Sequence, residues 1–154
     1  VAVKDKYKPD PTVASDGGSK VMAVWVGRSD ATADLDLFFA QSADKGVTWT
    51  APALLNANGA SDAGLDVSPN VAWFGGQNRW VVAWESTNNI GGIGSDLDIM
   101  FSVRPHTNWY AFCAIEHTRL DNTESHADTH YGLKTAVHGK SIVAVWHSQA
   151  NPFN

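Results

Sequence analysis

Short apolar segments separated by polar, glycine-containing loops run through the whole chain. No segment combines the roughly 3.6-residue periodicity of an amphipathic helix with a capping residue at its start. Apolar and polar residues alternate only in part, which is typical of strands that are covered on both faces. The pattern predicts an all-β protein, and in the first third of the chain it predicts strands over residues 12–15, 20–27, 35–41 and 53–55.

The same features return in the same order after about sixty residues. An apolar segment that ends in Trp25 recurs before Trp84 and before Trp146. The segment Asp34–Phe39 (D-L-D-L-F-F) recurs as Asp96–Phe101 (D-L-D-I-M-F). A Pro-x-Val-Ala segment precedes a Gly-Gly pair in the first two copies. Each copy therefore predicts one small sheet of four strands, with the equivalent tryptophans mainly in the core.

A hairpin signature follows the third predicted strand, where the chain reads S-A-D-K-G-V-T-W and matches S-x-D-x-G-x-T-W. Asp44 can accept hydrogen bonds from backbone N–H groups of a tight turn. Gly46 can take a positive φ without steric cost. The hydroxyls of Ser42 and Thr48 can satisfy the remaining turn groups, and Trp49 can bury its ring beside the hairpin.

The signature and the repeat together resemble the sialidase-like BNR-repeat propellers, whose Asp-box has this form. The resemblance covers nearly the whole chain and implies a partial β-propeller of four-stranded antiparallel blades. It places the first blade at about residues 10–56, the second at about 66–116 and half of a third at about 128–154. In the second copy Arg104-Pro105-His106 replaces the turn aspartate and glycine, so that hairpin must close differently.

Two and a half blades do not make a closed ring, because propellers usually close with about four to eight blades. The sequence therefore leaves three alternatives open: a piece of a longer protein, a subunit of a homo-oligomer that completes the propeller, or a segment that closes in an unfamiliar way. Of these, the truncated third copy favours a fragment or an assembling subunit.

Composition excludes some classes of partner. The 154 residues carry a net charge of −5, with 44% hydrophobic and 18% charged residues, as in an ordinary globular domain. No basic run is present, which disfavours nucleic-acid binding. No stretch approaches the roughly 18 apolar residues of a membrane span. Cys113 is the single cysteine, so the compartment is not determined, and only the resemblance favours secretion.

In the resembling family, the functional loops join the second strand of a blade to the third, and the fourth strand to the next blade. The corresponding loops here include residues 29–34, 56–66, 86–96 and 116–130. Sialidases use three arginines, a tyrosine–glutamate pair and an aspartate. Only Arg28 and Arg119 match the loop positions of such arginines, and neither an Arg-Ile-Pro motif nor a matched tyrosine–glutamate pair is present. A complete sialidase site is therefore not expected in this chain.

A general glycosidase needs only two carboxylates, and many lie at the predicted loop ends. Glu85 and Asp96 are the candidates that we retain for such a catalytic role. Asp34 and Asp36 recur as Asp96 and Asp98 in the second copy, and a residue repeated from blade to blade favours a structural role in loop hydrogen bonding.

Two further groups of side chains could bind ligands. Trp73, Trp80 and Tyr131 could stack on sugar rings if they are exposed. His126, Asp128 and His130 project to one side of an extended segment and could hold a divalent metal ion. A solvated loop, or a histidine–aspartate hydrogen bond, is the simpler interpretation of that motif, and nothing else in the sequence calls for a cofactor.

Three functions remain open at this point. The first is a non-catalytic, sialidase-like propeller module that binds carbohydrate or a protein partner through its loop face. The second is a fragment or subunit of a sialidase-like glycoside hydrolase. The third is a structural repeat protein without a small-molecule ligand. The incomplete arginine set favours the binding module over the enzyme.

Overall fold

The computed structural model describes residues 10–28, 34–56, 59, 62–89, 97–104, 113–114, 130–138 and 141–148. From residue 104 onward it describes the backbone alone, except for the side chains of Ala136 and residues 143–145. Within these ranges the chain is all-β, with antiparallel sheets and one short 3-10 turn, η1 (Gly75–Gln77). None of the described segments forms a helix long and apolar enough to cross a membrane.

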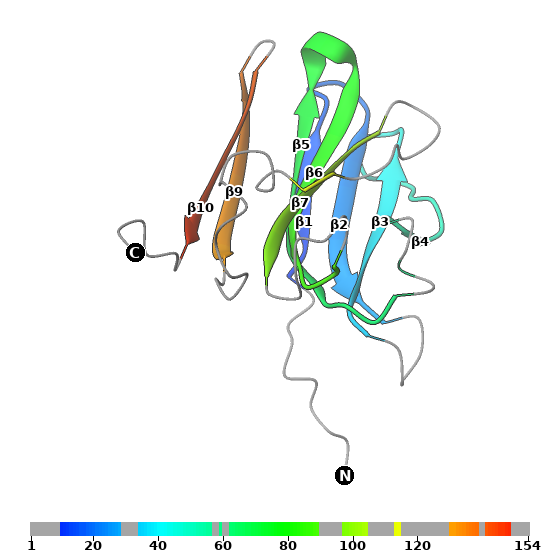
Figure 1. The fold of residues 1–154 in the computed structure, drawn as a ribbon. Coiled ribbons are helices and arrows are strands. Elements are labelled where there is room, and N and C mark those ends of the chain that lie inside the picture. Colours follow the sequence, from blue (N-terminus) through cyan, green and yellow to red (C-terminus); the bar gives the residue numbers. More distant parts are fainter. Residues whose placement is uncertain are drawn as a thin grey trace.

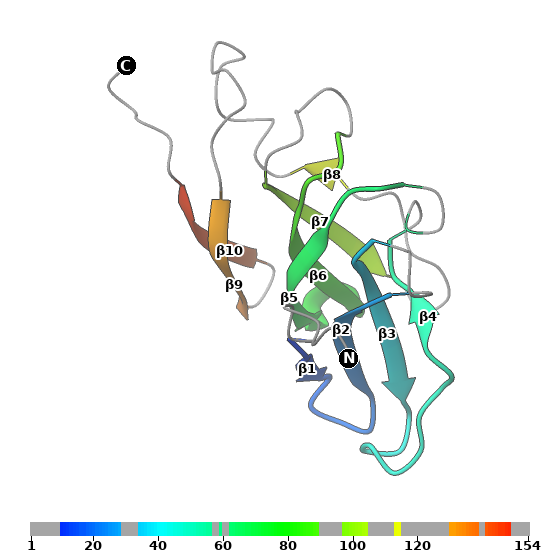
Figure 2. The same ribbon diagram turned by 90° about the horizontal axis from the view of Figure 1, so that it is seen from below.

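The described strands form three antiparallel sheets that stand side by side (Figures 1 and 2). The first sheet holds β1 (Thr12–Ser15), β2 (Val21–Gly27), β3 (Asp36–Ser42) and β4 (Ala53–Leu54), paired in chain order. The second holds β5 (Asp66–Phe74), β6 (Arg79–Ser86), β7 (Asp98–Arg104) and β8 (Cys113–Ala114), again in chain order. The third consists of β9 (His130–His138) and β10 (Ser141–Ser148). The four strands predicted for the first copy agree with β1–β4 to within one residue at each end.

The first two sheets repeat one another in register as well as in order. Trp25 pairs with Phe38 in the first sheet, and Trp84 pairs with Met100 at the equivalent place in the second. At the strand ends, Asp36 faces Gly27 just as Asp98 faces Ser86. The sequence repeat therefore corresponds to a structural repeat.

The main core lies between the first and second sheets. Strand β2 buries every second side chain against β5, because alternate side chains of a strand point to opposite faces. The second sheet is covered on both faces, since Ala83 and Ile99 pack on the other side with Ala144 of β10. The buried residues of the main core come from both sheets: Met22, Val24, Val26, Leu35, Leu37, Phe39, Leu55, Val71, Trp80, Val82, Trp84 and Met100.

The two equivalent tryptophans differ in burial because their sheets are covered differently. Trp84 is 1% exposed, in the sheet with two covered faces. Trp25 is half-buried on the outer face of the first sheet, where it stacks on Phe38 with ring centroids 6.4 Å apart. The expectation that strands are covered on both faces is therefore correct for the second sheet and wrong for the first. Val13, Val143 and Val145 are each more than half exposed, on β1 and β10.

The turn that follows β3 is held by side-chain hydrogen bonds. Ser42 Oγ accepts from the backbone N–H groups of Asp44 (3.2 Å) and Gly46 (2.8 Å) and donates to Asp44 Oδ1 (2.7 Å). Asp44 also accepts from the backbone N–H (2.8 Å) and the hydroxyl (2.5 Å) of Thr48. Gly46 has φ of 89°, the conformation predicted for it. These hydrogen bonds, led by those from Thr48, lower the pKa of Asp44 to about 2.

One expectation for this turn was wrong. Trp49 does not bury its ring, which is 44% exposed. Its indole N–H donates instead to the carbonyl oxygen of Gly46 at 3.0 Å, so the ring lies across the outside of the turn.

Replacing Asp44 by alanine is expected to lower the melting temperature of the protein by about 5 °C, because the turn N–H and hydroxyl groups lose their acceptor. Asp44→Asn keeps one acceptor oxygen and should have a smaller effect. Differential scanning calorimetry of the two variants and the wild type measures both changes in melting temperature. Equal melting temperatures for Asp44→Ala and wild type would contradict the structural role of this carboxylate.

Candidate functional site

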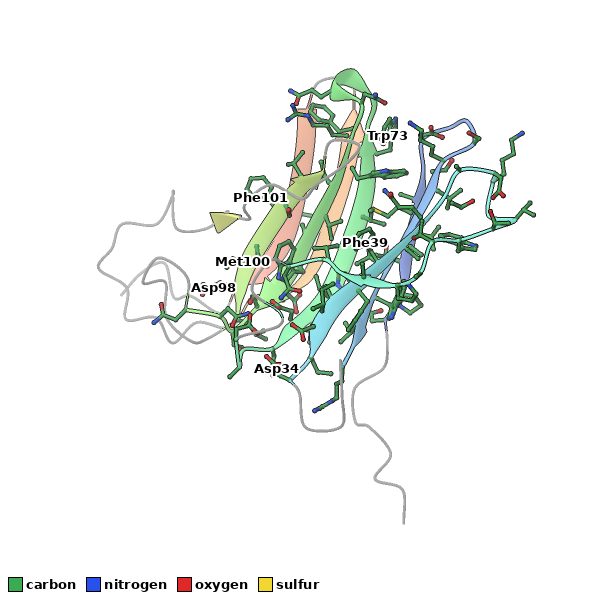
Figure 3. All side chains as sticks on the ribbon, turned by 90° about the vertical axis from the view of Figure 1, so that its right-hand side faces the viewer. Asp34, Phe39, Trp73, Asp98, Met100 and Phe101 are labelled. Atoms are coloured by element: carbon green, nitrogen blue, oxygen red, sulfur yellow. The ribbon has the colours of Figure 1, made fainter. Side chains whose placement is uncertain are left out.

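The loops predicted to carry function meet at one end of the first two sheets. At this end β2 and β6 finish while β3, β5 and β7 begin. Figure 3 shows Asp34 and Asp98 at the same end of the strands, with Trp73 toward the opposite end. We call the described residues of this end the loop edge: Arg28, Asp34–Asp36, Asn56, Gly59, residues 62–66 and residues 86–89.

Asp66, the first residue of β5, is the centre of a buried hydrogen-bond network at the loop edge. Its backbone N–H donates to the carbonyl of Leu35 at 2.8 Å, which joins the second sheet to the start of β3. Its Oδ1 accepts from the indole N–H of Trp84 at 2.8 Å. Its Oδ2 accepts from the side-chain amides of Asn56 (2.7 Å) and Asn88 (3.2 Å). The side chains of Asn56, Trp84 and Asn88 therefore meet on the carboxyl group of one residue that is 1% exposed.

Three further carboxyl groups lie beside this network. One oxygen from each of Asp34, Asp36 and Asp62 lies within 4.8 Å of the other two. Asp36 is fully buried, whereas Asp34 and Asp62 are half-buried and reach solvent. Asn56 connects this trio to Asp66, because its amide also donates to Asp36 Oδ1 at 3.3 Å. We call Asp34, Asp36 and Asp62 the acidic cluster.

Gly59 allows the loop to approach the acidic cluster closely. A Cβ atom at this position would lie 2.5 Å from Asp36 Oδ1 and 2.7 Å from Asn56 Oδ1. Any other residue would therefore push the backbone away from both oxygens. The glycine keeps the loop backbone against the carboxylate and amide oxygens.

Burial, together with neighbouring carboxylates, raises the pKa values of Asp36, Asp62 and Asp66. Burial, the hydrogen bond with Asp34 and the charges of Asp66, Asp34 and Asp36 raise the pKa of Asp62 to about 7. Burial also raises the pKa of Asp66 to about 6, in spite of the hydrogen bonds from Ser86 and Trp84. The pKa of Asp36 is raised by burial, against the lowering effect of its hydrogen bond from Asn56. Protons or a cation must therefore balance this concentration of negative charge near neutral pH.

The carboxyl spacing does not suit glycoside hydrolysis. The two catalytic carboxyl groups of a glycosidase stand about 5 Å or more apart, with the sugar between them. Asp34 and Asp62 are hydrogen-bonded directly to one another, which leaves no room for a substrate. Asp36 and Asp66 are 0% and 1% exposed, so a substrate cannot reach them. Among the described carboxyl groups of the loop edge, none forms such a catalytic pair.

The structure separates the predicted catalytic candidates from one another. Arg28 is exposed at the end of β2, at the loop edge as predicted. Glu85 is only 3% exposed and lies on the face of β6 that carries Ala83, so it is not part of the acidic cluster, and its catalytic role stays a prediction. Arg119 and Asp96 lie outside the described residues.

The predicted sugar-stacking residues are not at the loop edge either. Trp80 is 4% exposed and packs edge-on against Trp73, with ring centroids 4.7 Å apart. Its proposed stacking role was therefore wrong, because a core ring offers no free face to a sugar. Trp73 is partly buried against the same core. Both tryptophans are next to η1, at the end of the sheet opposite the loop edge.

A pocket of about 210 Å³ lies at the hairpin end, away from the loop edge. Its walls come mainly from the first residue of β2, the last residues of β3 and the turns next to them, together with Trp80. The lining residues are Lys20, Val21, Gln41, Ser42, Ala43, Thr50 and Trp80. The pocket carries one charged group and no carboxylate, so it offers little chemistry beyond hydrogen bonding.

The predicted histidine-containing metal motif cannot be compared with the structure. His126 and Asp128 lie outside the described residues, and of His130 and Tyr131 only the backbone in β9 is described. The acidic cluster is instead the group of potential metal ligands that the described residues bring together.

Sequence reasoning selected the loop 56–66 but not Asn56, Asp62 or Asp66 as site residues. The sequence could have indicated two of them by their positions, because Asn56 and Asp66 flank the loop between β4 and β5. The repeated Asp36 was interpreted as structural, which agrees with its full burial and its hydrogen bond from Asn56.

Comparisons with known proteins bear on the fold alone. No protein-family model matches the chain, and no curated protein matches it in sequence. Among solved structures, the chain is similar to the Hadza microbial sialidase Hz136, with a TM-score of 0.56 and 15% sequence identity. The match covers 69% of this chain and 25% of the sialidase, so the similar region is about a quarter of that protein's length. The described part of the chain therefore has a sialidase-like fold.

Proposed function

We propose that this chain is a non-catalytic, sialidase-like propeller module that binds a neutral carbohydrate through its loop edge. The observation that carries the proposal is the acidic cluster, in which Asp34 and Asp62 reach solvent beside the buried network. Carboxylate and amide oxygens accept hydrogen bonds from sugar hydroxyls. The carboxyl groups of the cluster offer no positively charged side chain to pair with the carboxylate of an anionic sugar such as a sialic acid, so a neutral sugar fits the cluster better.

We infer further that the three sheets are blades of an incomplete ring and that the Ser42–Trp49 turn is an Asp-box. The repeated strand order and register support the blades, and the hydrogen bonds of Asp44 support the Asp-box. Val13, Val143 and Val145 are the apolar side chains that further blades, from the same chain or from other copies, would cover. A protein ligand at the loop edge is the other partner that the sequence leaves open.

A second candidate function is supported by the similarity to the microbial sialidase. The chain would then be one part of a sialidase-like glycoside hydrolase, with Arg28 and Arg119 as carboxylate-binding residues and the remaining catalytic groups on other blades. The incomplete arginine set and the lack of a matched tyrosine–glutamate pair in the sequence rank this candidate second.

One pair of assays on the same preparation separates the two candidates. We expect titration calorimetry to detect a neutral oligosaccharide, such as a galactose- or N-acetylglucosamine-terminated one, with a Kd of about 1 mM or tighter. Sialyllactose should bind at least about tenfold more weakly because of its carboxylate. No turnover of a fluorogenic sialoside is expected.

Asp34→Asn with Asp62→Asn should weaken binding of the neutral sugar, whereas Asp16→Asn is the matched control. Asp16 lies in the turn between β1 and β2, at the opposite end of the sheet, and the substitution makes the same carboxylate-to-amide change at one position instead of two. Sialoside turnover that is lost in Arg28→Ala would contradict the binding module and support the hydrolase.

A further inference from the structure

The acidic cluster has the composition and spacing of a cation site. Its three ligand oxygens lie within 4.8 Å of one another. Ligand oxygens of one Ca²⁺ lie at about 2.3–2.6 Å from the ion, so two of them can be up to about 5 Å apart. Mg²⁺ binds oxygens at about 2.0–2.1 Å and needs a tighter, octahedral set. The oxygen-only donor set also disfavours zinc, which prefers nitrogen and sulfur ligands.

A second observation comes from Asn56, which is not part of the acidic cluster. Its side chain is 4% exposed, and its Oδ1 has no hydrogen-bond partner. The orientation of the amide is fixed, because Nδ2 donates to carboxylate oxygens of both Asp36 and Asp66. Oδ1 lies close to Asp36 Oδ1, because a Cβ atom at Gly59 would be 2.7 Å from the first oxygen and 2.5 Å from the second. A buried amide oxygen without a donor is rare, and a cation satisfies it.

Two carboxylate oxygens of the cluster share this property. Asp36 Oδ2 and Asp34 Oδ2 are both buried and have no hydrogen-bond partner. Leaving a buried acceptor unpaired is unfavourable, and the cost is larger for a charged one. A divalent ion in the cluster would give these buried acceptors a positive partner and offset the repulsion among the carboxylates.

We propose that Asp34, Asp36 and Asp62, together with the amide oxygen of Asn56, bind one Ca²⁺ ion at the loop edge. Asp36 is the first residue of β3 and Asp34 lies two residues before it. Asn56 and Asp62 belong to the connection between the first and second sheets. The ion therefore fastens this connection to the start of β3. Asp34 and Asp62 are half-buried, which leaves the site reachable from solvent. This inference does not depend on carbohydrate binding.

The test is a calcium titration of the wild-type chain by isothermal titration calorimetry at about pH 8, where Asp62 is ionised. The sample is first treated with a chelator and then dialysed. We expect one site with a Kd of about 10⁻⁵–10⁻³ M, the range of calcium sites with few charged ligands. Mg²⁺ should bind at least about tenfold more weakly. Saturating calcium should raise the melting temperature by about 5 °C.

Two variants identify the ligands. Asp34→Asn with Asp62→Asn removes two charges but keeps the shape of the side chains, and should weaken calcium binding by at least about thirtyfold. Gly59→Ala leaves every ligand in place but crowds Asp36 and Asn56, and should weaken binding by about tenfold. Asp16→Asn should bind calcium as the wild type does.

Circular dichroism establishes that each variant is folded before it is compared. If the double variant does not fold, the calcium affinities of Gly59→Ala and the wild type still test whether calcium binds at the acidic cluster. No binding heat and no change in melting temperature with about 10 mM calcium would overturn the proposal. Unchanged calcium affinity in a folded double variant or in folded Gly59→Ala would overturn it as well. Failure of sugar binding with calcium binding intact would contradict only the proposed function.

Discussion

Replacing Trp84 by phenylalanine is expected to lower the free energy of unfolding by about 3 kcal/mol. The substitution removes the indole N–H that donates to Asp66 Oδ1 at 2.8 Å, inside a region where both residues are 1% exposed. The loss of a buried donor costs more than the net value of one hydrogen bond, because the carboxylate loses a partner that water cannot replace. The smaller ring also leaves a cavity between two covered faces of the second sheet.

Trp25→Phe is the matched control, because Trp25 occupies the equivalent position of the first sheet. Its ring is half-buried and stacks on Phe38, so the substitution should cost less than about 1 kcal/mol. Urea denaturation followed by circular dichroism gives both values. Equal losses in the two variants would show that the hydrogen bond to Asp66 contributes nothing specific.

The second large effect is a fall in stability as the pH rises from about 4 to about 7 in the absence of divalent cations. The folded-state pKa values of Asp66, about 6, and Asp62, about 7, lie above the usual aspartate value. Between the unfolded and folded pKa values, the folded protein holds more protons than the unfolded chain. The free energy of unfolding therefore decreases with rising pH in this window and levels off above it.

The buried Asp66 alone accounts for an expected loss of about 3 kcal/mol over this window, since one pKa unit corresponds to about 1.4 kcal/mol. Urea denaturation at several pH values, with a chelator present, measures the fall. In Asp62→Asn the free energy of unfolding should decrease less near pH 7 than in the wild type, because the substituted side chain does not titrate. Stability that increases from pH 4 to pH 7 would contradict the assignment of these raised pKa values.

Local sequence patterns predicted the fold well. The repeat and the strand boundaries of the first sheet follow from side-chain periodicity, and the turn after β3 follows from Asp44 and Gly46. What the pattern could not supply is which sheet faces are covered. Trp25 and Trp84 occupy the same place in the repeat but differ in exposure, because among the sheets that the structure describes only the second has a neighbouring sheet on each face.

The candidate site was predicted only as a set of loops. Its residues come from different copies of the repeat: Asp36 begins β3, Asp66 begins β5 and Asn88 follows β6. Such a cluster depends on how two sheets stack, which residue spacing within one copy does not determine. Whether Trp80 is exposed could not be predicted from the sequence, because contact between the two sheets is what buries it.

The measurement that tests the central claim most directly is an NMR titration of the ¹⁵N-labelled protein with a neutral oligosaccharide. The account predicts shift changes that concentrate at the loop edge, at the amides of Asp34–Asp36, Gly59, residues 62–66 and residues 86–89, with no hydrolysis of the sugar. Shift changes confined to the hairpin end, around Lys20, Gln41 and Thr50, would contradict it by placing recognition in the pocket there. Hydrolysis of the sugar during the titration would contradict the non-catalytic role.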